Sequence, residues 1–248
     1  MIFSRRFIDF IDRVTKPIAD LFEKIEISVA GERWWIVGPK GTGKTVLHNL
    51  LSGEPVAEAS YSVTQIHDEA TSGMYKAGKK IIRHKTSRDY GGEFLETWEE
   101  GVKDHKRFVF VYSLNDLDGT MCYCFNKDAI KPSDKYELNR DDLLYENIMN
   151  AFVLAINILH DNFSDDYSLP ADKRKLLVLC NKTDLWPQGC RPQFFQPYKQ
   201  IVEDMKAEVK ALDLTANTRF SVSYEACSFI SHPRTSFDAI MSKFLNKV

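Results

Sequence analysis

The chain has 248 residues, of which 44% are hydrophobic and 12% aromatic, which is enough to bury the core of about one domain. Its 33 Lys and Arg residues nearly balance its 35 Asp and Glu residues, so the composition offers no overall basic surface for nucleic acid. Five cysteines do not make a disulfide framework, and no apolar run approaches the roughly 20 residues that cross a bilayer. We therefore expect a cytoplasmic, globular protein with no nucleic-acid partner.

Residues 1–28 are predicted to form an amphipathic helical extension that Pro17 interrupts. Residues 1–24 carry five basic and four acidic side chains, so their attraction to anionic lipid is weak. We expect the extension to pack on its own domain or on a protein partner rather than on a membrane. Its apolar residues recur at steps of three and four: Phe3, Phe7, Phe10, Ile11, Val14, Ile18, Leu21, Phe22 and Ile25.

Strand and helix patterns alternate through residues 29–248, which we expect to form one domain. The alternation predicts an α/β fold with a mostly parallel sheet and helices on both faces. Two polar stretches, 117–138 and 161–173, lack periodicity and are predicted to be insertions. The expected strands are 34–37, 108–113, 175–180 and 220–224, and the expected helices are 46–51, 139–161, 197–212 and 235–247.

A glycine-rich turn follows the first of these strands and matches G-x-x-x-x-G-K-[ST] at each fixed position. Glycines let successive backbone N–H groups point at one phosphate, and the positive end of the following helix adds to the attraction. Lys44 would contact the β- and γ-phosphates, and Thr45 would place its hydroxyl on Mg²⁺. The predicted phosphate-binding residues are Gly38, Pro39, Lys40, Gly41, Thr42, Gly43, Lys44 and Thr45.

A second motif, Asn181-Lys182-Thr183-Asp184, ends the apolar strand at 175–180. Ligands bind at the carboxyl edge of parallel sheets. Asp184 can accept hydrogen bonds from guanine N1–H and the 2-amino group, and adenine offers neither donor there. Lys182 would lie along the base, and Asn181 would tie this loop to the phosphate-binding loop. The two motifs together predict GTP and GDP as the ligands.

The glycine-rich turn is a P-loop, which implies a fold of the P-loop NTPase type. A P-loop followed by N-K-x-D resembles the Ras-like GTPase superfamily, and Asp89-Tyr90-Gly91-Gly92-Glu93 is similar to its D-x-x-G switch. The D-x-G-G form, Trp98 and the segment 108–116 look most like the ADP-ribosylation-factor branch, which also carries an amphipathic N-terminal helix. Glu225-Ala226-Cys227-Ser228 is similar to the loop whose backbone contacts guanine O6. The resemblance therefore implies that Cys227 and Ser228 help to bind the base.

The resemblance also implies roles for the switch residues. Asp89 would hold Mg²⁺ through a water, and Gly92 would bind the γ-phosphate through its N–H. A threonine between Thr45 and Asp89 should coordinate Mg²⁺ in the triphosphate state. Thr71, in Thr71-Ser72-Gly73, fits the family's T-x-G pattern, and Thr64 is the alternative.

Three features depart from the family's pattern. The segment 81–88, which precedes Asp89, is too polar for an interior strand. Asp116-Leu117-Asp118-Gly119 is a competing D-x-x-G, although it is far from Lys44 in the chain. Glu93 stands where Ras-like enzymes usually have the Gln that orients the attacking water. Because its negative charge would repel the γ-phosphate, we expect slow hydrolysis.

The preferred function is a switch that binds GTP or GDP with Mg²⁺, hydrolyses GTP and has an unidentified protein effector or regulator. The alternatives are a nucleotide-binding scaffold without hydrolysis and a P-loop ATPase in which 181–184 is a coincidence. A basic cluster within residues 76–88 is expected to be a solvated strand face, or else to meet an acidic partner or RNA. Neither the histidines nor Cys122-x-Cys124 forms a metal-binding motif.

Overall fold

The computed structural model describes residues 31–53, 68–69, 73–77, 80–84, 88–89, 97–99, 102–105, 107–115, 140–164, 174–186, 191–217, 220–230 and 235–246. The N-terminal extension 1–28, the stretch 117–138 and most of 161–173 lie outside these residues, so the expectations for them stay predictions.

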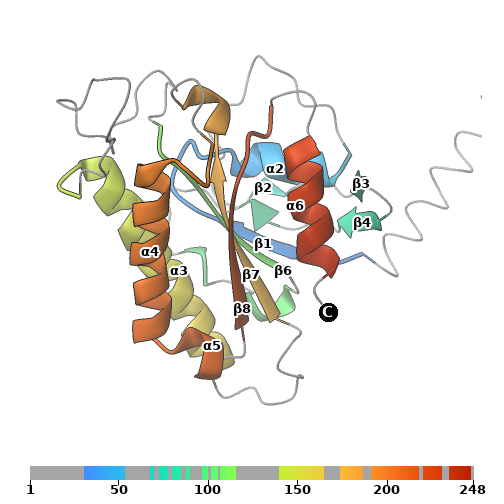
Figure 1. Ribbon diagram of the computed structural model, residues 1–248. Coiled ribbons are helices and arrows are strands. Elements are labelled where there is room, and N and C mark those ends of the chain that lie inside the picture. The colour runs from blue at the N-terminus through green and yellow to red at the C-terminus, as the bar shows by residue number, and fades with distance from the viewer. Residues whose placement is uncertain are drawn as a thin grey trace, which may run out of the picture.

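A parallel sheet of four strands forms the centre of the fold (Figure 1), with the order β1-β6-β7-β8. Each strand lies where the sequence predicts it, and the last three strands extend one or two residues beyond the predicted bounds. The first three contain apolar runs, whereas the last alternates apolar and polar residues. The mostly parallel α/β architecture is therefore confirmed. The strands are β1 (Trp34–Val37), β6 (Arg107–Ser113), β7 (Arg174–Asn181) and β8 (Phe220–Ala226).

Helices cover both faces of this sheet (Figure 1). Trp34 and Ile36 pack in the core beneath α2 and α6, whereas Trp35 and Val37 pack in the core beneath α3 and α4. Because successive strand residues point to opposite faces, both sets must be apolar. The helices are α2 (Lys44–Leu51), α3 (Leu143–Phe163), α4 (Gln196–Ala211), the short α5 (Leu214–Asn217) and α6 (Thr235–Asn246).

Helix α3 begins after Asp142, whose carboxylate accepts a hydrogen bond of 2.8 Å from the backbone N–H of Leu144. It ends at Phe163 rather than at the predicted residue 161, and so it includes the start of the stretch predicted to be an insertion. The reason is packing, because the Phe163 ring lies 5.6 Å from that of Phe108 and 5.7 Å from that of Phe220, centroid to centroid.

Among the helices that the structure describes, α3 alone is long and apolar enough to cross a membrane, with a mean hydropathy of 1.3. The sequence analysis did not single it out. A core helix meets the same criteria, and the inner side of α3 is buried against the sheet by residues such as Phe152, Ala155 and Leu159. We therefore describe α3 as a core helix.

Four short strands form a hairpin beside β1. Strand β3 (Gly73–Ala77) pairs with β4 (Lys80–His84), and β2 (Asp68–Glu69) pairs with β5 (Arg88–Asp89), both antiparallel. The pair Asp68↔Asp89 lies five residues before Gly73 on one strand and five residues after His84 on the other. The two ladders therefore share one register. The sequence analysis predicted no strand at β2 or β3.

The polar sequence of β4 reflects burial on one face only. Ile82 and His84 are buried, whereas Ile81 is half exposed. A single parallel bridge between Glu32 and His84 joins β4 to the start of β1, with a hydrogen bond of 2.9 Å from Glu32 N–H to Arg83 O. The expectation that an interior strand here must be apolar was therefore wrong, because the strand lies in a hairpin that has only one covered face.

Candidate functional site

The turn between β1 and α2 has backbone conformations that only glycine adopts readily. Gly41 and Gly43 have φ angles of 72° and 96°, and Gly38 has a φ of 150°. A Cβ on Gly38 would lie 1.9 Å from the carbonyl oxygen of Val111 in β6. The turn therefore lies directly against the neighbouring strand, and α2 begins at Lys44 with its first N–H groups facing the turn.

Two side chains of the loop converge on one carbonyl. The Lys44 ammonium and the Thr42 hydroxyl each donate to Pro39 O, at 3.0 Å and 2.9 Å. Lys44 is buried, while Lys40 is exposed at the tip of the turn. The loop therefore has one buried lysine, Lys44, and one exposed lysine, Lys40. Thr45 lies in the first turn of α2.

Asn181, the last residue of β7, connects three loops. Its Nδ2 donates to Thr42 O at 2.9 Å, and its Oδ1 accepts from Phe229 N–H at 3.1 Å. A Cβ on Gly43 would lie 2.5 Å from the same Nδ2, so the contact is close-packed. The structure therefore brings together the glycine-rich turn, the N-K-x-D motif and the loop after β8, as the sequence analysis expected of Asn181.

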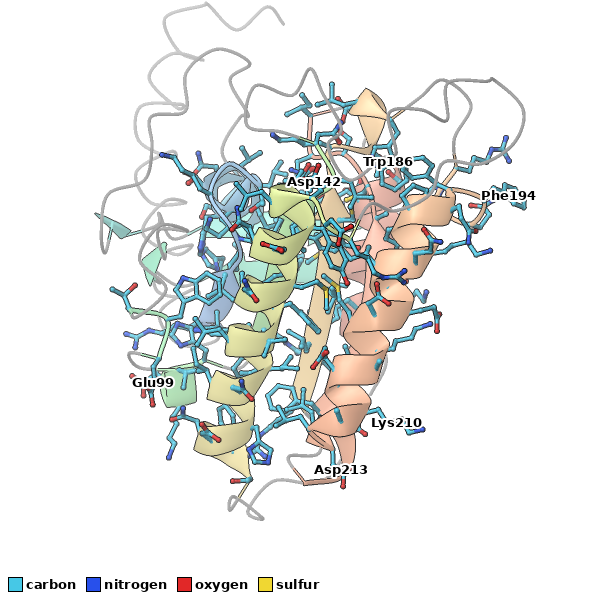
Figure 2. All side chains as sticks on the ribbon, turned by 90° about the vertical axis from the view of Figure 1, so that its left-hand side faces the viewer. Glu99, Asp142, Trp186, Phe194, Lys210 and Asp213 are labelled. Carbon is cyan, nitrogen blue, oxygen red and sulfur yellow. The ribbon has the colours of Figure 1, made fainter. Side chains whose placement is uncertain are left out.

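The loops after β7 and β8 are also joined by their backbones. Cys227 N–H donates to Cys180 O at 2.9 Å, and Thr183 N–H donates to Cys227 O at 3.3 Å. Lys182 has a left-handed φ of 62°, which turns the chain into a short 3₁₀ helix, η3 (Thr183–Leu185), where the Asp184 side chain is exposed. Figure 2 shows Trp186, next to this helix, at the end of the molecule where Asp142 begins α3, with Lys210 and Asp213 at the opposite end.

Cys227 and Ser228 are both buried. Burial raises the pKa of the Cys227 thiol to about 12, and the nearby carboxylates of Glu225 and Asp184 act in the same direction. The thiol therefore stays protonated and unreactive at neutral pH. Cys180 belongs to the core beneath α3 and α4, whereas Cys227 belongs to the core beneath α2 and α6. Because the Cys227 side chain is buried in the core, only the backbone of the loop after β8 could contact a base at this residue.

The backbone of Asp89 lies near the glycine-rich turn. His84 is level with Glu32, and both chains run in the same direction. Strand β5, which contains Asp89, contacts both β1 and α2, the two elements that flank the glycine-rich turn. The Mg²⁺-binding role of Asp89 stays a prediction.

Four predicted site residues lie outside the described part of the chain: Thr71, its alternative Thr64, Gly92 and Glu93. The competing Asp116 also lies outside it, although Asn115 before it is buried at the end of β6. The roles assigned to these residues stay predictions.

The sequence analysis missed a buried pair of imidazoles next to the site. His48 Nδ1 on α2 lies 3.3 Å from His84 Nε2 on β4, and both side chains are almost completely buried. The pKa of each is lowered to about 3, mainly by burial, and for His48 the Lys44 ammonium contributes to this shift. Both rings are therefore neutral, and they form a polar contact between the helix that begins at Lys44 and the hairpin.

Comparison with known proteins gives a fold likeness and no family. No family model matches the chain, and no curated protein matches it. Among solved structures, the chain is similar to the small GTPase Arl6 (BBS3) of Trypanosoma brucei, solved with the nucleotide analogue GppNp. The identity is 14% and the TM-score 0.47, over 88% of this chain and 100% of that one. These values are too low to assign the chain to a family, so the site rests on the geometry of the chain itself.

Proposed function

We propose that the chain binds GTP and GDP together with Mg²⁺ and hydrolyses GTP, and so acts as a guanine-nucleotide switch. The observation that carries this proposal is the Asn181 side chain, which joins Thr42 O of the glycine-rich turn to Phe229 N–H after β8. A phosphate-binding turn and a candidate base-binding loop are thus held in one fixed relation. Only a ligand with both parts, a nucleotide, would use that relation.

Guanine specificity is assigned to Asp184. Its exposed carboxylate stands on η3, directly after the residue that is tied to the glycine-rich turn. Asp184→Asn should weaken GDP binding by about a hundredfold and favour xanthosine diphosphate, whose 2-oxo group needs a donor. Displacement of a fluorescent GDP analogue measures both effects, with Asp213→Asn at the far end of the molecule as the matched control. If ATP displaced the analogue as well as GTP does, the ATPase alternative would replace this proposal.

The donor set fits Mg²⁺ held jointly with nucleotide oxygens. Among the described residues, no group of three His, Cys, Asp or Glu could hold a metal alone. Mg²⁺ prefers a few protein oxygens together with phosphate oxygens and water. The Thr45 hydroxyl and the Asp89 carboxylate would be those protein oxygens, and the bound ion would neutralise phosphate charge.

Thr71 is proposed as the third oxygen donor to Mg²⁺, with Thr64 as the alternative. Thr71→Ala should remove the Mg²⁺ dependence of binding of a GTP analogue. The same loss in Thr64→Ala alone would favour the alternative.

Hydrolysis distinguishes the switch from a nucleotide-binding scaffold. Glu93 is the residue that favours the scaffold, because a carboxylate there opposes the charge that phosphoryl transfer gathers. Single-turnover hydrolysis of bound GTP should be slow but measurable, and Glu93→Gln should leave it equal or faster. A drop of about tenfold or more, about 1.4 kcal/mol of barrier, would mean that Glu93 is itself catalytic. No turnover in either protein would support the scaffold.

A further inference from the structure

The glycine-rich turn is packed against an aromatic ring that the proposed nucleotide chemistry does not use. Gly43, directly before the start of α2, has a left-handed φ of 96° and no side chain with which to cap that helix. Its conformation therefore depends on the groups packed around it. A Cβ on Gly43 would lie 2.5 Å from Asn181 Nδ2 and 3.3 Å from Cδ2 of the Phe229 ring, so the amide and the ring both lie close to Gly43.

Phe229 is joined to the site by its backbone as well as by its ring. Its N–H donates to Asn181 Oδ1 at 3.1 Å, and its side chain is buried. The Phe229 ring meets the ring of Phe237, in the first turn of α6, edge to face, with the centroids 5.5 Å apart and the planes at 72°. Rings in this arrangement attract each other and restrict each other's orientation. Phe237 therefore helps to determine where the Phe229 ring lies against Gly43.

Phe237 is itself held by the hairpin. Its side chain is fully buried, and the ring of Tyr75 in β3 lies 5.8 Å from its ring, centroid to centroid. The Tyr75 hydroxyl donates to Asp238, the next residue of α6. Figure 1 shows α6 beside the β3–β4 hairpin, and α6 and β3 are in contact. Three rings, from β3, α6 and the loop after β8, thus form a continuous line of contacts that ends at Gly43.

A second phenylalanine of α6 provides a comparison within the same helix. Phe244 lies seven residues after Phe237, about 10 Å along the helix axis, and it is likewise buried. Its ring lies 6.0 Å from that of Trp34 in β1, centroid to centroid. Both phenylalanines belong to the core beneath α2 and α6, but the contacts of Phe237 lead to the turn and those of Phe244 lead to the sheet.

We propose that Phe229 and Phe237 are positioning residues, which hold the glycine-rich turn and the start of α2 in the conformation that binds phosphate. The inference deepens the proposed function and rests on it. Backbone N–H groups that already point at the ligand bind it without a cost of reorganisation. Without the two rings Gly43 would take other conformations, because glycine is the least restricted residue, and only the fraction of molecules with the correct turn would bind.

A role in core packing alone predicts a different result. Loss of a buried ring lowers the free energy of unfolding, but the molecules that stay folded would then bind nucleotide as before. Loss of a positioning ring lowers the affinity of the folded molecules as well. The affinity of the folded protein, measured separately from its stability, therefore decides between the two roles.

The test compares Phe237→Leu with Phe244→Leu in the full chain, because each variant removes one buried ring from the same helix. Displacement of a fluorescent GDP analogue should show about tenfold weaker binding for Phe237→Leu, at a temperature where each variant is folded by circular dichroism. Phe229→Leu should weaken binding by a similar or larger factor, whereas Phe244→Leu should stay within about twofold of the parent. Urea unfolding of the same variants measures the loss of core packing separately.

Amide hydrogen exchange gives a second readout that needs no nucleotide. Residues 43–46 should exchange about tenfold faster in Phe237→Leu than in Phe244→Leu, and equal exchange would overturn the inference. If the parent binds GDP and the two α6 variants bind it equally well, the inference is overturned and the proposed function stands. If the parent binds no GDP, the proposed function is overturned, and the exchange of residues 43–46 alone decides whether the rings hold the turn.

Discussion

The parallel half of the molecule and the hairpin half are attached to the fold in different ways. In the parallel half, β1, β6, β7 and β8 pair along their lengths, and the Asn181 side chain joins the loops at their carboxyl ends. The hairpin joins β1 through the bridge Glu32↔His84 and α2 through the contact between His48 and His84. It joins α6 through Tyr75, whose ring packs on Phe237 and whose hydroxyl donates to Asp238. Within the described residues, ladders of backbone hydrogen bonds thus join the parallel strands, whereas side-chain contacts hold most of the hairpin.

This difference is what the proposed switch function would require. Loops that recognise a base and a phosphate must keep one spacing, and a packed core with buried hydrogen bonds provides it. A segment that reports the nucleotide state must instead have two arrangements of similar free energy, which is easier where few contacts have to change. The strength of attachment of each half is therefore the property to test.

The largest expected effect comes from adding one methyl group to each half. A Cβ on Gly38 would lie 1.9 Å from Val111 O, and a Cβ on Gly73 would lie 1.9 Å from Ser52 O. Gly38→Ala should cost at least about 3 kcal/mol of unfolding free energy, because β6 cannot move and the φ of Gly38 disfavours alanine. Gly73→Ala should cost about 1 kcal/mol, because the hairpin can shift. Urea unfolding measures both, and an equal or larger loss for Gly73→Ala would contradict the comparison.

Removal of the tie at Asn181 should have the next largest effect. Asn181→Ala leaves Thr42 O and Phe229 N–H without their partner, which costs about 2 kcal/mol of unfolding free energy. It should also weaken GDP binding by about tenfold, because the two loops lose their fixed spacing. Asn181→Asp separates the two bonds, since a carboxylate can accept from Phe229 N–H but cannot donate to Thr42 O. Asn150→Ala, exposed on α3, is the control, and a loss in Asn150→Ala equal to that in Asn181→Ala would refute the role of the tie.

The comparison also explains how much of the molecule can be predicted from the sequence. Strands β1, β6 and β7 contain continuous apolar runs, such as Leu176–Cys180, because both of their faces are buried, whereas the edge strand β8 alternates apolar and polar residues and is only partly buried. The glycine-rich turn follows from a motif whose spacing has a physical reason, and so does the contact of Asn181. Core burial and motif chemistry therefore predict this half well.

The hairpin half could not be predicted in the same way. Strand β2 has two residues and β3 has five, which is too short for a period of two to stand out. Strand β4 is buried on one face only, so it contains polar residues, and these made the segment look unlike an interior strand. The contact between His48 and His84 joins residues 36 apart in the chain, and no local pattern announces such a pair. The left-handed backbone of Lys182 likewise follows from the packing of its loop rather than from its residue type.

At pH 6 and above, the smallest expected effect is a pH dependence at the contact between the hairpin and α2. His48 and His84 have pKa values of about 3 in the folded protein, because burial disfavours their charged forms, against about 6.5 in the unfolded chain. Between these values the unfolded chain binds more protons, so the folded state loses stability as the pH falls below about 6.5, and it gains nothing further above that pH. For the pair the loss should reach about 1.5 kcal/mol at pH 6, with a slope that approaches about 1.4 kcal/mol per pH unit for each imidazole.

Substitution at each position assigns this slope to the pair. His48→Gln and His84→Gln should each remove about one proton from the pH dependence of the unfolding free energy, measured by urea unfolding between about pH 5 and 7. The double variant should remove about two. Because a neutral glutamine cannot titrate, this readout is independent of any constant loss of packing that the substitution causes. If the single variants kept the full slope of the parent, the acid sensitivity would belong to other groups, and the two imidazoles would be excluded as the pH-sensitive link between the hairpin and α2.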